Sequence, residues 1–233
     1  MKTFRARSGP FLERPHFEPS EIDRICAQEL RDTGLYPNSP QPIRIDRFVE
    51  KRFNVVPQYK ELPPGVLGYT EFSKKGVVGI VISASLDAEG GKVAERRVRT
   101  TLAHEGGHGL LHAYLFALSE RPRELFDADS HSDQQILCRD IAGEETKRRS
   151  YDGRWWEYQA NRAMGGLLCP RALLQEALKP YLVPTGSLGR IVLDERRRET
   201  AIKTLADVFD VNPVVARIRV DEIYPAETGQ LQL

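Results

Sequence analysis

The sequence predicts an α+β protein that is mainly helical and carries a small, mostly antiparallel sheet. Two stretches have the apolar and β-branched composition of strands, residues 66–72 and 77–83, and residues 73–76 between them have hairpin character. Most other apolar positions recur at the three-to-four-residue spacing of helices. A length of 233 residues suits one medium domain, with or without a small appendage.

Composition and charge exclude several classes of protein. The net charge of +1 gives no global electrostatic argument for binding nucleic acid or an anionic membrane. The three cysteines are far apart and form no C-x-x-C pair, so a cysteine zinc site is not expected and a reducing compartment fits best. No apolar run approaches a membrane span, and the first residues lack a secretory signal. We therefore expect a cytoplasmic protein with no membrane partner.

The first part of the chain reads as a leader followed by two helices. Residues 1–19 hold three prolines among charged and aromatic residues and are expected to be extended or disordered. Ser20 and Asp23 suggest a capping box for a helix that ends near Gly34. Its expected apolar face is Ile22, Ile25, Cys26 and Leu30. A second helix is expected over residues 45–53, ahead of the strands.

The second part is expected to be helical on both sides of an irregular connection. A long helix is expected over residues 95–118, and residues 119–153 are polar and irregular apart from strand-like residues 136–138. Helices over 155–168 and 171–178 should follow. Residues 180–189 then read as a linker, and residues 194–223 as two helices broken at 210–212. Asn212 suits an N-cap and Pro213 the first helical position.

Three basic runs stand out against the near-neutral chain. They surround residues 96–99, 147–149 and 196–198, and acidic residues lie close to each. Such runs are usually solvated faces of helices. We therefore expect these arginines and lysines to face solvent.

One pentapeptide in the long helix indicates metal chemistry. Residues 104–108 read His-Glu-Gly-Gly-His, which is the H-E-x-x-H pattern of zinc enzymes. His104 and His108 lie one turn apart, so both imidazoles can reach one ion. Glu105 is placed to act as the catalytic base on the attacking water. The alternative is a helix that carries two surface histidines.

A catalytic zinc ion normally takes three protein ligands, so one more is needed. The pattern H-E-x-x-H-x-x-G-x-x-H is excluded, because Leu111 and Tyr114 stand where it needs Gly and His. Glu157 is the best candidate, because a carboxylate beside Trp155 and Trp156 on an apolar helix face needs a partner. The alternative is a solvated glutamate that the helix dipole favours.

Other polar residues compete for the site or support it. Rival ligands lie in the irregular connection, where they are harder to pre-organise: Asp127, Asp129, His131, Glu144 and Glu145. Asn161 is placed to hydrogen-bond a metal ligand from one turn beyond Glu157. His112 is expected to pack beside the site, because three histidines on one straight helix cannot all reach one ion. Tyr151, Tyr158 and His112 are candidates for stabilising the oxyanion, and the sequence does not choose between them.

Two separated motifs resemble those of the ImmA/IrrE family of bacterial metallopeptidases. Residues 101–112 match its H-E-x-G-H-x-x-L-H helix. Residues 157–161 and 167–170 match its later E-x-x-A-N helix, which ends in a Leu-Leu-x-Pro turn. The resemblance covers residues 20 to 180 in round numbers, and it implies a zincin-like metallopeptidase domain.

The resemblance also implies residue roles and a substrate class. His104, His108 and Glu157 would bind one Zn²⁺ ion, and Glu105 would be the base. Members of the family cleave DNA-binding repressors, so the expected substrate is a helix-turn-helix repressor whose loss switches on stress or mobile-element genes. The alternative is a catalytically weak or inactive metal-binding regulator that docks a repressor or binds DNA through its tail.

The chain departs from the family pattern at two positions. Gly106 stands where the family usually has a bulky apolar residue, and Cys169 stands where Met is common. With Gly107 and Gly109, the helix holds three glycines within four residues, each costing roughly 1 kcal/mol relative to Ala. Close approach of another backbone, such as a strand packed on the helix, is the expected reason. The alternative is a site that has drifted towards inactivity.

The resemblance also suggests a division of the chain. Residues 1–19 form the leader, residues 20–185 the metallopeptidase domain, and residues 186–233 a helical tail with a helix-turn-helix cadence. The second helix of the tail offers only Arg217 and Arg219 as basic groups, with acidic residues close behind. Packing against the domain is therefore favoured over DNA contact through residues 194–223.

Overall fold

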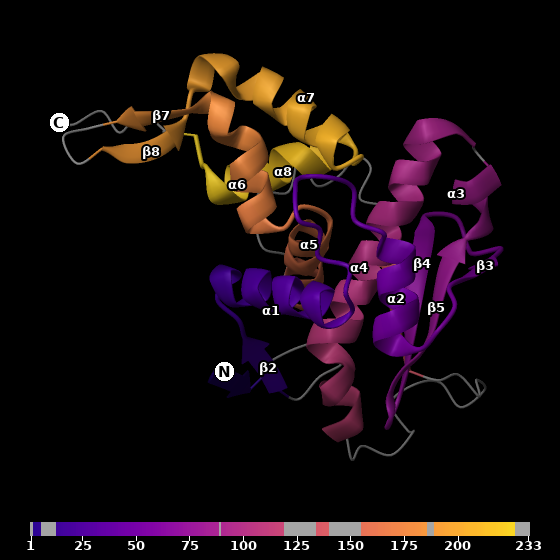
Figure 1. Cartoon of the computed structure of the whole chain (residues 1–233). Helices are drawn as coiled ribbons and strands as arrows, with labels where there is room; N and C mark the ends of the chain where they lie inside the picture. Colours follow the sequence, from indigo (N-terminus) through magenta and orange to yellow (C-terminus); the bar gives the residue numbers. More distant parts are fainter. Residues whose placement is uncertain are drawn as a thin grey trace.

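A computed structural model of the chain describes residues 2–5, 13–88, 90–118, 134–139, 155–185 and 189–226. These residues form eight α-helices and three small sheets, so the predicted α+β class is confirmed (Figure 1). None of the described helices combines the length and the apolar character needed to cross a membrane.

The main sheet has the strand order β3-β5-β4-β6. β4 (Val66–Ser73) and β5 (Gly76–Ser83) form the predicted antiparallel hairpin. β6 (Gln134–Arg139) pairs antiparallel with β4 and contains the strand-like residues noted in the sequence. β3 (Gln58–Lys60), which the sequence pattern did not reveal, pairs parallel with the end of β5. The sheet is therefore mostly antiparallel, as predicted.

The long helix α4 (Gly91–Leu118) runs through the middle of the molecule (Figure 1). It packs against β4 and β5 on one side and against α5 (Trp155–Leu168) on the other. It starts a turn earlier than predicted, directly after the short helix α3 (Ala84–Ala88) and Gly90, whose φ is +65°. Because α4 has neighbours on several sides, the residues of its middle are buried whether polar or apolar.

The N-terminal segment contains more structure than the expected leader. β1 (Lys2–Arg5) and β2 (Glu13–His16) pair antiparallel. α1 (Pro19–Asp32) follows, and its N-cap is Glu18, so the capping box predicted from Ser20 and Asp23 is wrong. The carboxylate of Glu21 accepts a hydrogen bond from the Glu18 backbone N–H at 2.8 Å, which places the box two residues earlier.

The first two helices use the apolar faces that the sequence indicated. Ile22, Cys26 and Leu30 of α1 are buried. α2 (Ile45–Phe53) has its predicted bounds and ends at Asn54, which adopts a left-handed conformation with φ 56°. Both helices pack close to the middle helices, α1 against α5 and α2 against α4.

The C-terminal part begins with α6 (Arg171–Leu178). The expected linker contains a hairpin instead, formed by β7 (Leu182–Thr185) and β8 (Arg190–Leu193), which projects from the molecule in Figure 1. α7 (Arg198–Val208) and α8 (Pro213–Ile223) are the two predicted tail helices, and α8 starts with the predicted N-cap and proline.

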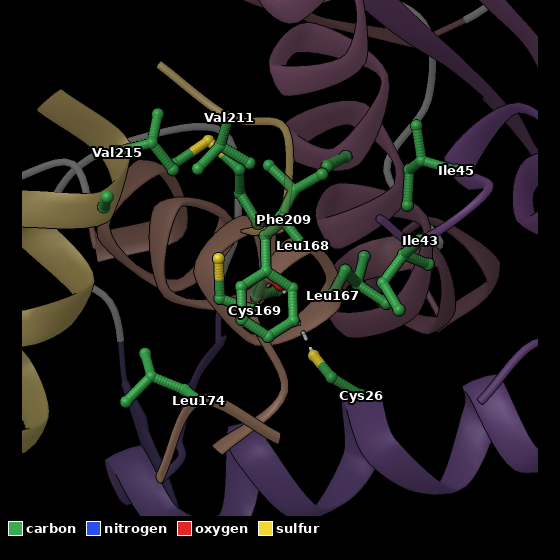
Figure 2. Close-up of a cluster of buried hydrophobic side chains, with 14 of the residues drawn as sticks. Cys26, Ile43, Ile45, Leu167, Leu168, Cys169, Leu174, Phe209, Val211 and Val215 are labelled. Atoms are coloured by element: carbon green, nitrogen blue, oxygen red, sulfur yellow. Dashed lines mark hydrogen bonds between the residues drawn. The ribbon is translucent and has the colours of Figure 1, made fainter. Parts of the chain in front are cut away.

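One hydrophobic core joins the tail to the rest of the protein. Figure 2 shows Leu167, Leu168 and Cys169 at the end of α5 close to side chains of other elements, among them Cys26 of α1 and Phe209 of the tail. All of these side chains belong to one cluster of buried residues. The core therefore continues across the boundary expected between residues 185 and 186.

Candidate metal centre

Three side chains from α4 and α5 converge at one point. The Nε2 atoms of His104 and His108 are 3.0 Å apart. The carboxylate of Glu157 lies 3.3 Å from the first and 3.6 Å from the second. His104 and His108 come from successive turns of α4, and Glu157 comes from the first turn of α5. These residues form a candidate metal-binding triad.

The tautomer of His104 is set by Asn161. The Oδ1 atom of Asn161 lies 3.0 Å from His104 Nδ1. An amide oxygen only accepts hydrogen bonds, so Nδ1 of the imidazole carries the proton and donates. The Nε2 atom of a neutral His104 then presents a lone pair towards His108 and Glu157.

The tautomer of His108 is set through a second histidine. His108 Nδ1 lies 3.0 Å from His112 Nδ1, and His112 Nε2 lies 3.1 Å from Oε1 of Gln159. Because the amide oxygen accepts from Nε2–H, the Nδ1 atom of neutral His112 is free of a proton and accepts from His108. His108 therefore also presents the lone pair of its Nε2 atom to the triad.

The donor set fits a small divalent cation. Two imidazole lone pairs and a carboxylate that face one another would repel, and a cation at their centre removes that repulsion. Ligands held at about 2.0–2.1 Å around a tetrahedral zinc ion stand about 3.3 Å apart. The observed separations of 3.0, 3.3 and 3.6 Å are close to this value. Two histidines and a glutamate are also a common protein ligand set of catalytic zinc.

Burial and mutual contacts keep the site residues in the ligand-competent protonation states. Burial lowers the pKa of His108, against the opposing effect of Glu157. Burial and the neighbouring His108 lower the pKa of His112 to about 3. Burial alone would raise the pKa of Glu157, but its close contacts with His104 and His108 outweigh that effect and hold its pKa well below the usual range. His108 and His112 are thus neutral and Glu157 is ionised near pH 7.

One carboxylate oxygen of Glu105 faces the sheet. Its Oε2 atom accepts a hydrogen bond of 2.5 Å from the hydroxyl of Thr70 on β4. Both side chains belong to residues with 0% exposure. A short hydrogen bond of this kind is typical of an ionised carboxylate. Thr70 therefore fixes the orientation of the residue that the sequence motif marks as a base.

The three glycines in and beside the motif differ in how much room a side chain would have. A Cβ atom at Gly107 would lie 2.9 Å from the backbone oxygen of Ala160 and from the side chain of Ala163, so α5 approaches α4 closely there. The expected close approach of another backbone is therefore confirmed at Gly107, although that backbone belongs to a helix and not to a strand. A Cβ atom at Gly106 would meet other atoms only at 3.7 Å or more, which is ordinary contact. At Gly109 the nearest group is the ring of Phe53, at 2.6 Å.

The structure brings some of the predicted site residues together and does not bring others to the site. It brings together His104, His108 and Glu157, with Asn161 and His112 behind the imidazole rings. Tyr158 is 47% exposed, and its hydroxyl accepts a hydrogen bond from Arg162. The other proposed residues lie outside the described part of the chain: Asp127, Asp129, His131, Glu144, Glu145 and Tyr151.

Two polar residues of the centre were missed in the sequence. Thr70 occupies a buried position in the alternating pattern of β4, on the face that meets α4. Gln159 is 5% exposed and sits two residues after Glu157 on α5. A polar residue at a position that the strand or helix periodicity marks as buried was the available signal for both.

A cavity of about 760 Å³ lies elsewhere, among α6, β7, β8 and the residues after α8. None of the described residues that line it belongs to the metal centre.

Comparison of the chain with protein-family models and with curated proteins gave no match. The chemistry of the centre is therefore inferred from its own residues.

Proposed function

We propose that this protein is a zinc-dependent endopeptidase. The observation that carries the proposal is the convergence of two imidazole lone pairs, from His104 and His108, with the ionised carboxylate of Glu157. His104 and His108 lie on the helix that also holds Glu105. Zinc bound by this donor set would lower the pKa of a water molecule to about 7 and polarise a carbonyl group.

The residues around the triad supply the remaining tasks. Asn161 and His112 hold the imidazole rings in the orientation and tautomer that bind metal. The carboxylate of Glu105 would accept a proton from the attacking water and return it to the leaving amine. The hydroxyl of Thr70 keeps this carboxylate in one orientation between the two proton transfers.

The substrate class follows from the resemblance to the ImmA/IrrE family. We propose that the protein cleaves a helix-turn-helix repressor and so derepresses stress or mobile-element genes. The tail supports a packing role over DNA contact, because Arg219 is 2% exposed and Arg217 forms a two-pronged pair with Glu199 at 2.6 and 2.7 Å. Arg219 is therefore not available to bind a phosphate, and Arg217 would first have to leave Glu199.

The test compares the wild-type protein with Glu105→Gln. Zinc content is measured by mass spectrometry of the purified proteins, and both are then incubated with a proteome from cells that lack the gene. We expect one zinc ion per chain in both, and new protein N-termini only with the wild type, with a loss of cleavage of at least 10³-fold in the variant. Wild-type protein that retains no zinc after zinc-supplemented purification would overturn the proposal.

A second candidate function is a metal-dependent binding protein that docks a repressor without cutting it. The burial of the centre favours it, because His104, Glu105 and His108 are at most 1% exposed. Glu157 is the accessible member, with a side chain that is 18% exposed. The same experiment separates the two functions. A docking protein would retain its target equally well as wild type and as Glu105→Gln, with no new N-termini from either.

A further inference from the structure

A continuous chain of hydrogen bonds leads from the metal centre to the N-terminal strand β2. It runs from His108 through His112 and Gln159 to the backbone carbonyl of Pro15, and the last step is 2.8 Å long. Pro15 and Gln159 are separated by 144 residues in sequence. This series of hydrogen bonds therefore connects three elements, α4, α5 and β2, that are far apart in the sequence.

The carbonyl of Pro15 determines which way round the amide of Gln159 sits. A carbonyl only accepts hydrogen bonds, so the NH₂ group of Gln159 must face it. The Oε1 atom of the same amide then faces His112 Nε2 at 3.1 Å. A reversed amide would place an NH₂ group against the ring of His112 and an oxygen against the oxygen of Pro15. Only one orientation satisfies both ends.

We propose that Gln159 is a positioning residue that selects the metal-binding tautomer of His108 through His112. With Nε2–H of His112 committed to Gln159, its Nδ1 atom is an acceptor for His108 Nδ1–H. The Nε2 lone pair of His108 is then directed at the triad. This role rests on the proposed metal centre, and it adds a requirement that Gln159 and the Pro15 carbonyl meet before the ion is held tightly.

We call the hydrogen bonds from His108 through His112 and Gln159 to the Pro15 carbonyl the relay. Because the side chains of the relay are buried, water cannot easily replace these hydrogen bonds. His108 and His112 are 0% exposed and Gln159 is 5% exposed. The ring of Trp155 packs edge-on against His112 with the centroids 5.6 Å apart, and so closes the side of the relay. His104 reaches the same result in one step through Asn161. The two zinc-binding histidines thus depend on different supports, one on α5 alone and one on α5 together with β2.

The experiment uses the full chain and two readouts. In ¹⁵N-labelled zinc-free wild type, NMR of the imidazole nitrogens should show His112 as a single neutral tautomer with the proton on Nε2. Zinc affinity is measured by competition with a chromophoric chelator. For Gln159→Leu we expect binding about 10–100-fold weaker, since loss of such outer partners typically has this effect. Gln28→Leu is the matched control, because Gln28 is exposed on α1 and its amide donates a hydrogen bond to Asp32.

Each outcome bears on a separate statement. Affinity within twofold of wild type in Gln159→Leu, or His112 with its proton on Nδ1 in the wild type, would overturn the relay. The tautomer measurement needs neither a variant nor bound metal, so it decides the relay even where Gln159→Leu fails to fold. Wild-type protein that binds no zinc but shows the Nε2–H tautomer of His112 would contradict the proposed function while leaving the hydrogen-bond relay standing.

Discussion

At the scale of single residues, the candidate metal centre is built from polar side chains whose orientation depends on a second polar group. Asn161 orients the ring of His104 through a hydrogen bond. His112, which is itself held by Gln159, orients the ring of His108. Thr70 orients the carboxylate of Glu105 in the same way. Buried polar groups without such partners would be costly, because they have lost their hydrogen bonds to water. The partners therefore stabilise the fold and prepare the site together.

The hydroxyl of Thr70 should matter for catalysis more than for metal binding. Thr70→Val keeps the shape of the side chain but removes a hydrogen bond to a charged group, which is typically worth about 1.5–3 kcal/mol. We expect cleavage rates to fall by roughly 10–100-fold, with zinc content unchanged. Thr100→Val is the control, since the Thr100 hydroxyl bonds the backbone oxygen of Arg96 on α4. Cleavage at the wild-type rate by Thr70→Val would show that Glu105 does not depend on this contact.

At the scale of elements, the centre depends on how closely α5 lies against α4. Glu157 reaches the two histidines because Gly107 lets the backbone of Ala160 approach. Gly68 of β4 has a similar role on the opposite side of α4, where a Cβ atom would lie 2.9 Å from the side chain of Thr101. Small residues on α4 and β4 thus set the spacing of the layers around the candidate metal centre.

The two adjacent glycines of the motif should therefore respond differently to alanine. Gly107→Ala must push α5 away, and we expect it to lower the free energy of unfolding by about 1–3 kcal/mol through overpacking. Zinc affinity should fall as well, because Glu157 moves with α5. Gly106→Ala finds room and replaces a poor helix former, so we expect no loss and up to about 1 kcal/mol of gain. Urea unfolding of the zinc-free proteins measures both, and equal effects would contradict the packing.

At the scale of the whole molecule, the tail is locked to the domain by charge as well as by the core in Figure 2. Asp210, in the turn between α7 and α8, accepts hydrogen bonds of 2.9 Å from both Arg96 and Arg99 of α4. Arg96 is 8% exposed and Arg198 is 9% exposed, so the expectation that the basic runs face solvent is wrong for these two residues. Arg219 of α8 pairs with Asp23 of α1 in the same way.

Removing the charge of Asp210 should loosen the tail from α4. Asp210→Asn keeps the side-chain shape and tolerates the left-handed backbone, with φ 51°. We expect the free energy of unfolding to fall by about 2–3 kcal/mol, which is somewhat less than for a fully buried ion pair, because the Asp210 side chain remains 30% exposed. Unfolding by denaturant measures it. Glu199→Gln, which breaks the exposed pair with Arg217, should change stability little. Comparable losses of stability in both variants would argue against a structural role for the hydrogen bonds of Asp210 with Arg96 and Arg99.

The local features of the chain were predictable from sequence. The bounds of α2, α5, α6 and α8, the β4–β5 hairpin and the roles of Asn212 and Pro213 follow from periodicity, capping and turn residues close in sequence. The spacing of His104 and His108 is equally local, because one helical turn separates them. β3, β7 and β8 were missed, since short edge strands have too few residues to show a pattern.

The sequence by itself determined the two histidines, the adjacent glutamate and the elements that carry them, because helix geometry relates residues a few positions apart. Only the tertiary structure decided that Glu157 completes the triad, that α5 explains Gly107, and that Gln159 and Thr70 belong to the centre. The partners in these contacts lie far apart in sequence, 47 residues for His112 and Gln159 and 35 for Glu105 and Thr70. Their meeting depends on how whole elements pack, and no local pattern in the chain encodes it.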